Sequence, residues 1–316
     1  MERDIHMGRG ISFREQMRRT LNHKNRFGQS RQDAKQESRK NGRGGRVDGI
    51  YGKKTMNDYK AVGDQFDAWQ KQKGYRFRDM KEVQTRHLTE YLSERQEKGC
   101  SAWTLSRDMA ALNKIFGTSL TKKETGLKAR HSADIKNNRG FGKNYSPTVY
   151  RRNQEMTDFI HATGIRRQST SVIRPSDALR GADNTVIGFH VKEKGGKERN
   201  CCVLKEWREE ITRLVDARQE EHGNSPLFGA PDKNLNTHWY RAQYARDLYD
   251  GLSRAEREGK DYYDGYRSTF LDYGKLEKAV YGHPAVTKGL NTQILAEVSQ
   301  QLGHNRIDVV YTNYLY

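Results

Sequence analysis

The chain has little of what disulfide-stabilised, secreted and membrane proteins need. Its 316 residues include three cysteines, Cys100 and the adjacent Cys201 and Cys202, which match neither a disulfide framework nor a Cys-x-x-Cys metal site. Hydrophobic residues make up 34%, below the roughly 45–50% of ordinary globular chains. No run approaches the ~18 apolar residues of a membrane span, and the basic start lacks the apolar core of a secretion signal. We therefore expect a cytoplasmic protein in a reducing compartment, with no membrane partner.

The motifs of several cofactor-dependent and hydrolytic enzymes are also missing. The sequence has no Gly-x-x-x-x-Gly-Lys-[Ser/Thr] loop, no Gly-x-Gly-x-x-Gly after a strand, no Gly-x-Ser-x-Gly elbow and no His-Glu-x-x-His. These loops hold phosphates, dinucleotides or a reactive serine. Their absence argues against an NTP-driven motor, a dehydrogenase and a serine hydrolase.

What the chain does have is positive charge. Its 58 Lys and Arg residues against 40 Asp and Glu give a net charge of +18, and nucleic acid is the commonest partner of so basic a protein. Residues 1–54 carry half of the excess, a net +9, and are rich in Gly, Gln, Asn and Ser. So polar a segment buries too little apolar surface to offset its ordering entropy. We expect 1–54 to be a mostly disordered basic arm that contacts DNA, and a solubilising tail is the alternative.

Apolar spacing then predicts a compact all-α domain over residues 55–120. Tyr59, Val62, Phe66 and Trp69 share one helical face, and two further amphipathic helices follow, the second of them after a Ser101 N-cap. Residues 121–148 are again polar and basic, which suits a linker lying along a phosphate backbone. In these two segments the expected DNA-binding residues are Lys71, Lys73, Arg76, Arg107, Lys122, Lys123, Lys136, Arg139 and Lys143.

Residues 149–316 read as a second domain, mainly helical with a small antiparallel hairpin. The β-favouring runs 185–191 and 200–204 flank a turn at 194–197. Helices are predicted around 150–161 and at about 206–221, 236–252, 268–280 and 291–302. Helices around one short hairpin indicate an α+β domain rather than a doubly wound sheet.

Polar residues in this second domain form a pattern that suits work on a phosphate. His238 and Arg241 lie three apart on one helical face, so both can reach a single phosphate. Lys194 lies at the hairpin tip and Arg166 follows a helix. Leu302-Gly-His304 ends another helix, with Gly303 suited to the left-handed position after it. Each element alone is a common surface or helix-end feature, and the information lies in their joint order.

In this order, with Tyr314 ten residues after His304, the residues resemble the tyrosine recombinase family of phage-type integrases and chromosome-dimer resolvases. Residues 55–120 resemble its helical, SAM-like core-binding domain. The boxes that carry the resemblance are Thr163-Gly-Ile-Arg166, Lys194-Gly-Gly-Lys-Glu-Arg199, His238-Trp-Tyr-Arg241 and Leu302-Gly-His304 through Tyr314. The residues that match the family's catalytic positions are Arg166, Lys194, His238, Arg241, His304 and Tyr314.

The sequence departs from the family pattern at three places. Ser169 stands where the first box usually has Glu. The 63 positions from Arg241 to His304 exceed the usual spacing, so we expect an insertion at about 253–288. A helix packed on the catalytic core is the favoured interpretation of its aromatic residues, and a DNA-facing or protomer-facing surface is the alternative. The spacing from His304 leaves Tyr311 and Tyr316 as alternatives to Tyr314 for the nucleophile.

The resemblance implies a site-specific recombinase of a mobile genetic element that cuts and rejoins DNA through a 3′-phosphotyrosyl link, without metal, ATP or other cofactor. It also implies a double-stranded attachment site contacted by residues such as Lys197, a homo-tetramer on synapsed DNA from free monomers or dimers, an accessory DNA-bending protein, and a place in the bacterial nucleoid. The sequence leaves two other functions open. One is a DNA-binding protein that has lost catalysis, and the other is a nicking or relaxing enzyme resembling type IB topoisomerases.

Overall fold

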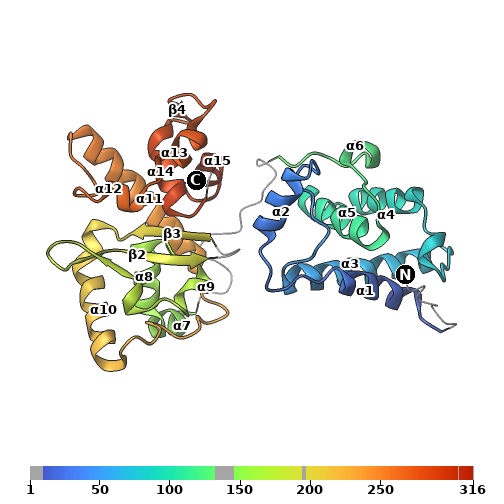
Figure 1. Cartoon of the computed structure of the whole chain (residues 1–316), viewed down its shortest axis with the longest axis horizontal. Coiled ribbons are helices and arrows are strands. Elements are labelled where there is room, and N and C mark those ends of the chain that lie inside the picture. The colour runs from blue at the N-terminus through green and yellow to red at the C-terminus, as the bar shows by residue number, and fades with distance from the viewer. Residues whose placement is uncertain (1–9, 132–145, 194–196, 305, 316) are drawn as a thin grey trace. The chain divides into compact units, whose positions relative to one another are not determined.

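The computed structural model describes residues 10–131, 146–193, 197–304 and 306–315. The chain divides into two compact units, Met1–Ile135 and Lys136–Tyr316 (Figure 1). Each unit encloses apolar side chains of its own. Within the described part of the chain, no helix is long and apolar enough to cross a membrane.

The first unit is all helical, as the sequence predicts. Its elements are α1 (Phe13–His23), α2 (Arg31–Lys40), α3 (Lys53–Gln72), a 3₁₀ turn (Met80–Glu82), α4 (Thr85–Glu97), α5 (Ala102–Phe116) and α6 (Lys122–Thr125). The predicted amphipathic helices are α3, α4 and α5, and Phe66, Leu88 and Leu112 are fully buried between them. Ser101 caps α5 because its hydroxyl accepts a hydrogen bond from the Thr104 N–H at 3.2 Å.

The segment before residue 55 differs from the expected disordered arm. α1 packs against α3 and α5, and its Phe13, Met17 and Leu21 are buried in the core of the first unit. These residues recur every four positions and therefore form one apolar stripe along a single helix. These three apolar residues have little effect on the composition of a segment that is otherwise rich in Arg, Gln and Gly, so the composition alone favoured disorder. Ser30 also caps a polar helix, α2, by accepting from the Asp33 N–H.

The start of the expected linker also differs from a simple tether. α6 is closed by a capping box between Thr121 and Glu124, and Leu127 is buried in the core of the first unit. Residues 121–131 thus extend that unit, and the division between the units falls at 135/136. Lys136, Arg139 and Lys143 lie outside the described residues.

The second unit is mainly helical with a small antiparallel sheet, which confirms the predicted fold class. Its helices are α7 (Pro147–Arg152), α8 (Gln154–Thr163), α9 (Arg167–Thr170), α10 (Arg208–His222), α11 (Thr237–Arg257), α12 (Arg267–Phe270), α13 (Tyr273–Val280), α14 (Thr292–Gln301) and α15 (Ile307–Asn313). Its strands are β1 (Ala178–Arg180), β2 (Val186–Glu193), β3 (Lys197–Cys202), β4 (Val286–Thr287) and β5 (Leu290–Asn291). The strands β1, β4 and β5 are too short to leave a pattern in the sequence.

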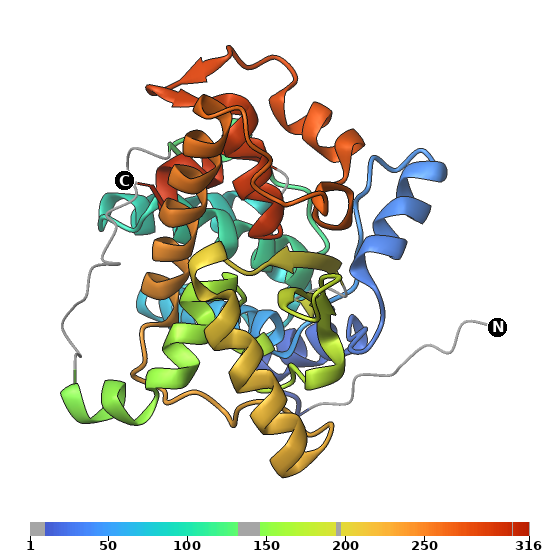
Figure 2. The same ribbon diagram turned by 90° about the vertical axis from the view of Figure 1, so that its left-hand side faces the viewer.

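The β2–β3 hairpin is the base on which the helices of this unit are arranged. β1, β2 and β3 pair in that order, with Val191 opposite Arg199 and Glu193 opposite Lys197. α10 packs against β2 and α14 against β3, so the sheet lies between α10 and the C-terminal helices (Figure 1). α11 packs against α8 and runs beside α14 (Figure 2). Chain segments far apart in the sequence therefore meet where α8, β3, α11 and α14 come together.

The region of the expected insertion, 253–288, contributes to this packing. Tyr262, Tyr263 and Phe270 are buried in the core shared by α11 and α14. Tyr273 and Tyr281 are exposed instead, at 54% and 89% of their surface. Most of the aromatic residues that stand out here thus stabilise the second unit rather than form a continuous outer surface.

Candidate active site

The C-terminal end of α14 is the centre around which the predicted catalytic residues gather. Gly303 has a φ of +69°, the left-handed conformation that glycine adopts without penalty. Its N–H donates to the Gln300 carbonyl and the His304 N–H donates to the Ser299 carbonyl, both at 2.8 Å. This is a Schellman ending, which turns the chain sharply and directs His304 back beside the helix end. The Leu-Gly-His motif thus ends the helix at a left-handed Gly303, as its sequence predicts.

Guanidinium groups satisfy the last carbonyls of α14. Arg199 donates to the carbonyl of Gln301, while Arg166 and Arg241 both donate to that of Leu302, Arg166 at 3.2 Å. A helix leaves its final carbonyls without intrahelical partners, and its C-terminus carries partial negative charge. The helix end therefore offers backbone acceptors to cations that arrive from β3, α9 and α11.

Arg241 is held from the opposite side by the end of α8. It is only 4% exposed, and it also donates to the carbonyl of Gly164, the C-cap of α8. Gly164 has a φ of +61°, and a Cβ there would lie 2.3 Å from the Tyr244 ring. Only glycine therefore lets α8 end this close to α11. The Thr-Gly-Ile-Arg box therefore supplies Arg166 itself, and its Gly164 carbonyl accepts a hydrogen bond that holds Arg241.

Tyr314 lies in the middle of this group. Ile307 and Val310 on α15 and Tyr314, the residue that caps its C-terminus, are spaced i, i+3, i+7 and are all buried, which turns the phenol ring inward. Its Oη accepts a hydrogen bond from Arg241 Nε at 3.3 Å and lies 3.2 Å from His304 Nε2. The His238 ring stacks on the phenol, with centroids 5.1 Å apart and planes 30° apart.

The electrostatics of the site favour an anion. Burial, followed by the nearby cations Arg241 and Arg199, lowers the pKa of Arg166 to about 10. Burial is also the main cause that lowers the pKa of Arg241. Arg166, Arg199 and Arg241 share this partly desolvated region with one carboxylate, Glu193, so positive charge remains in excess. A phosphate among the guanidinium groups would reduce their mutual repulsion.

The structure brings together five of the six residues predicted to be catalytic. Arg166, His238, Arg241, His304 and Tyr314 converge within the second unit. The sixth, Lys194, lies outside the described residues, and so does the alternative nucleophile Tyr316. The other alternative, Tyr311, has its ring 4.9 Å from Lys288 Nζ, whereas Tyr314 is the tyrosine hydrogen-bonded to Arg241.

The sequence analysis missed one charged residue of this group, Glu193, and gave no role to another, Arg199. Glu193 pairs with Arg166 and with Arg199, and both Glu193 and Arg199 side chains are almost fully buried. A signal was present in the sequence. Phe189, Val191 and Glu193 alternate along one strand, and this period of two places the carboxylate on the same buried face as its apolar neighbours.

Several residues predicted to bind DNA have carboxylate partners within the first unit. Lys71 pairs with Asp67 at 2.8 Å, Lys73 with Glu94, and Arg107 with Asp108 at 2.8 Å. Such partners reduce the charge that these side chains present to a phosphate. Arg76, Lys122 and Lys123 belong to the first unit as well, with Arg76 and Lys123 exposed, and Lys197 lies on β3.

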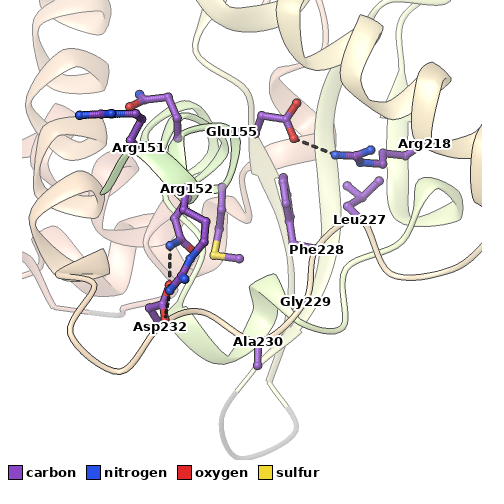
Figure 3. Close-up of a pocket in the computed structure, with 12 residues that line it drawn as sticks. Arg151, Arg152, Glu155, Arg218, Leu227, Phe228, Gly229, Ala230 and Asp232 are labelled. Carbon is purple, nitrogen blue, oxygen red and sulfur yellow. Dashed lines mark hydrogen bonds and ion pairs between the residues drawn. The ribbon is translucent and has the colours of Figure 1, made fainter. Parts of the chain in front are cut away.

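A separate hollow of about 670 Å³ lies in the second unit, between α7, α8 and the 227–232 segment (Figure 3). Two of the three arginines that line it form ion pairs, Arg152 with Asp232 at 2.8 Å and Arg218 with Glu155 at 2.7 Å. These two pairs reduce the positive charge that the hollow presents to an anionic ligand. Among the described residues, no group of three or more His, Cys, Asp or Glu side chains is placed to hold a metal ion.

Comparison with known proteins supports the family indicated by the motifs. Residues 45–124 match the family model described as phage integrase, N-terminal. A solved structure titled "Crystal structure of XerA recombinase" is 14% identical and is matched over 96% of this chain and 94% of its own, with a TM-score of 0.30. That TM-score is too low to establish a common fold. No curated protein matches the chain significantly.

Proposed function

We propose that the chain is a site-specific recombinase. The premise is that it belongs, through residues 45–124, to the tyrosine recombinase and phage integrase family. Members of that family break and rejoin DNA. The proposed substrate is double-stranded DNA carrying a recombination site, and the proposed intermediate is a 3′-phosphotyrosyl link to Tyr314. By the same resemblance, the proposed assembly is a homo-tetramer on two synapsed sites.

The observation that carries this proposal is the position of the Tyr314 hydroxyl. It lies within hydrogen-bonding distance of Arg241 and His304, and Arg241 shares the Leu302 carbonyl with Arg166. A DNA-binding protein without catalysis has no need to bury a tyrosine against a guanidinium and two imidazoles. A nucleophile for phosphorus has that need, because a phenol with a pKa of ~10 must lose its proton as it attacks.

In the proposed reaction, the Tyr314 Oη attacks the phosphorus of one phosphodiester. A bond forms from Oη to phosphorus, and the bond from phosphorus to the 5′ oxygen of the next nucleotide breaks. His304 accepts the phenol proton, since its Nε2 is 3.2 Å from Oη, and Lys194 donates a proton to the leaving oxygen. The phosphotyrosyl link retains the energy of the broken ester, so a 5′ hydroxyl from the partner duplex can reverse the step without ATP.

The arginines would stabilise the charge that develops on the non-bridging oxygens. Guanidinium groups make paired hydrogen bonds to phosphate oxygens, which a lysine cannot do. Preorganised donors of this kind contribute ~2.7–4 kcal/mol each in comparable sites. Their positive charge at the reacting phosphorus is the reason that the proposed reaction needs no metal ion.

The test is trapping of the covalent intermediate. A pool of nicked duplexes with random sequence around the nick is incubated with the protein, and DNA that stays attached in detergent is recovered and sequenced. A nick next to the cleaved bond releases a short fragment and prevents religation. We expect an adduct that mass spectrometry maps to Tyr314. Tyr314→Phe should abolish it, because the variant lacks the attacking oxygen, while DNA affinity stays nearly unchanged.

Tyr311→Phe is the matched control, since Tyr311 lies on α15 three residues before Tyr314 but has its ring beside Lys288. It should form adduct as the wild type does. An adduct that survives in Tyr314→Phe would move the nucleophile to another tyrosine, and a wild-type protein that binds DNA without forming any adduct would be a non-catalytic binder. Strand exchange between two selected sites, as opposed to relaxation of one supercoiled plasmid, separates a recombinase from a topoisomerase-like enzyme.

A further inference from the structure

Glu193 is a buried carboxylate that the reaction above does not use. It is the last residue of β2, and its side chain is 2% exposed. Burying a carboxylate is costly unless cations and hydrogen-bond donors surround it. The groups around Glu193 therefore indicate what keeps it in this position.

The partners of Glu193 belong to the candidate active site. It forms an ion pair with the Arg166 guanidinium, and its Oε1 accepts from the Arg166 backbone N–H at 3.1 Å. Its Oε2 lies 3.2 Å from Arg199 Nε, and its Oε1 lies 3.4 Å from the hydroxyl of Ser169. One carboxylate thus contacts both ends of Arg166 and a second guanidinium.

The register of the hairpin explains why Glu193 and Arg199 meet. Val191 pairs with Arg199 and Glu193 with Lys197, so Val191, Glu193 and Arg199 lie on the same face of the sheet. Val191 is buried on that face. Glu193 and Arg199 are diagonal neighbours there, within reach of the ion pair that the structure shows.

Ser169 lies one helical turn after Arg166, at the position where the sequence departs from the expected glutamate. The serine is buried at 4% exposure, and its short side chain carries no charge. Its hydroxyl donates a hydrogen bond to Glu193, but it cannot supply the negative charge of a carboxylate. The negative charge beside Arg166 therefore comes from the end of a strand rather than from the helix that follows Arg166.

We propose that Glu193 is a positioning residue which orients the guanidinium groups of Arg166 and Arg199 at the C-terminal end of α14, and that it takes over the part of a carboxylate at residue 169. This inference rests on the proposed function. Glu193 itself does not touch the DNA. It acts through Arg166, whose remaining N–H groups reach the Leu302 and Gly303 carbonyls at 3.2 and 3.4 Å.

The test compares Glu193→Gln with the wild type on a nicked duplex selected as above. At saturating full-length protein, the single-turnover rate of adduct formation should fall by about 10²-fold, the loss that a misplacement of ~1 Å produces at a reacting centre. The dissociation constant for the duplex should stay close to that of the wild type, whereas the melting temperature should fall, because two guanidinium groups lose a buried counter-charge. The rates are therefore compared at a temperature at which both proteins are folded. Glu198→Gln is the matched control. Glu198 lies on the same hairpin and its side chain is 51% exposed in an ion pair with Lys192, so this variant should react at the wild-type rate.

A double-mutant cycle tests whether Glu193 acts through Arg166. Arg166→Lys removes the fork that Glu193 orients, so adding Glu193→Gln to it should slow the reaction little further. Losses that multiply would overturn the inference, as would a Glu193→Gln rate equal to the wild type. If Glu193→Gln fails to fold, Glu193→Asp decides. It keeps the charge on a shorter arm, and it should fold, bind the duplex normally and react more slowly. An undiminished rate in Glu193→Asp would overturn the inference.

The failure of this inference differs from failure of the proposed function. If the wild type forms no adduct on any duplex of the pool, the proposed function fails. If the wild type forms adduct and the Glu193 variants match it, the recombinase chemistry stands and Glu193 has only a structural role.

Discussion

Gly303 shows how a single residue controls the distances within the candidate active site. Its φ of +69° ends α14, and a Cβ on it would lie 2.8 Å from Arg199 Nε and 3.1 Å from Arg166 Nη1. The glycine therefore does two things at once. It turns the chain toward His304, and it leaves the space that the two guanidinium groups occupy.

We predict that Gly303→Ala slows adduct formation by more than its loss of stability explains. The left-handed conformation costs an alanine about 1–2 kcal/mol, and the added methyl group also displaces the guanidinium groups. Gly289→Ala is the control, because Gly289 has a similar φ of +75° with nothing within 4 Å of a Cβ. Both variants should lower the melting temperature, and only Gly303→Ala should lower the single-turnover rate, by roughly 10- to 100-fold. Equal rates in the two variants would contradict this account.

At the residue scale, the residues of the candidate site that the sequence could indicate are those that lie in short motifs. Arg166, His238, Arg241, His304 and Tyr314 could be named because each stands at a fixed place in a box. Glu193 could not be assigned a role in this way. Its partners depend on the register of β2 with β3 and on the contact of β3 with α14, and both follow from packing among segments distant in the sequence.

At the scale of elements, the start of α4 depends on a buried histidine. His87 is 4% exposed, and its Nδ1 accepts a hydrogen bond from the Gln84 N–H at 3.0 Å. Its ring packs against Tyr75 and Phe77, with centroids 4.8 and 4.9 Å away. Nδ1 can accept this hydrogen bond only when it carries no proton. The capping of α4 therefore depends on a neutral imidazole.

We predict that acid destabilises the first unit through His87. Burial and then the Arg86 cation lower the pKa of His87 below its ordinary value of 6.5. The folded state thus resists protonation more than the unfolded state does. The contribution of His87 is complete above pH 6.5 and is lost as the pH falls through the lowered pKa. His87→Gln retains a side-chain acceptor without a charge. Between pH 7.5 and pH 5, it should therefore lose less melting temperature than the wild type, as followed by circular dichroism. Equal losses would exclude this role for His87.

The elements that could be predicted are the long ones with a strong apolar periodicity. α3, α4, α5 and the β2–β3 hairpin each present several turns or alternations of apolar residues. α1 presents only Phe13, Met17 and Leu21 within a basic segment, so the balance of composition favoured disorder. The break between α7 and α8 lies at Asn153, whose side chain donates to the carbonyl of Val149 at 2.7 Å and to Asp232 at 2.6 Å. Such a tertiary contact has no local signature.

At the scale of the whole molecule, the main property is the net charge of +18, which is only partly paired within the fold. Part of it is internally paired, as at Lys71, Lys73 and Arg107. Arg43 and Arg46 are exposed in the glycine-rich turn after α2. Deleting residues 1–50 to test the role of this charge would also remove α1 from the core, so charge-neutralising substitutions are the cleaner experiment.

We predict that Arg43→Gln/Arg46→Gln flattens the salt dependence of DNA binding. Each arginine that contacts a phosphate contributes about 0.9 to the slope of log K against log salt, because binding releases a condensed counterion. Lys260→Gln is the control. Lys260 is 73% exposed in the second unit and pairs with Glu258, and its loss should leave the slope unchanged. The measurement is fluorescence anisotropy on one duplex over a salt series. An unchanged slope in the double variant would show that this turn does not contact DNA.

The carbonyl of Leu302, held by both Arg166 and Arg241, has a consequence for fidelity. In the proposed reaction this carbonyl would compete with the phosphate, because it is an oxygen of the protein itself that already accepts hydrogen bonds from both arginines. A phosphate of loosely bound DNA would gain little binding free energy from that exchange. A phosphate of a duplex that makes many other contacts with the protein would displace the carbonyl more readily. If the proposed function holds, the helix end would set a threshold that favours cleavage of DNA already bound firmly elsewhere on the protein.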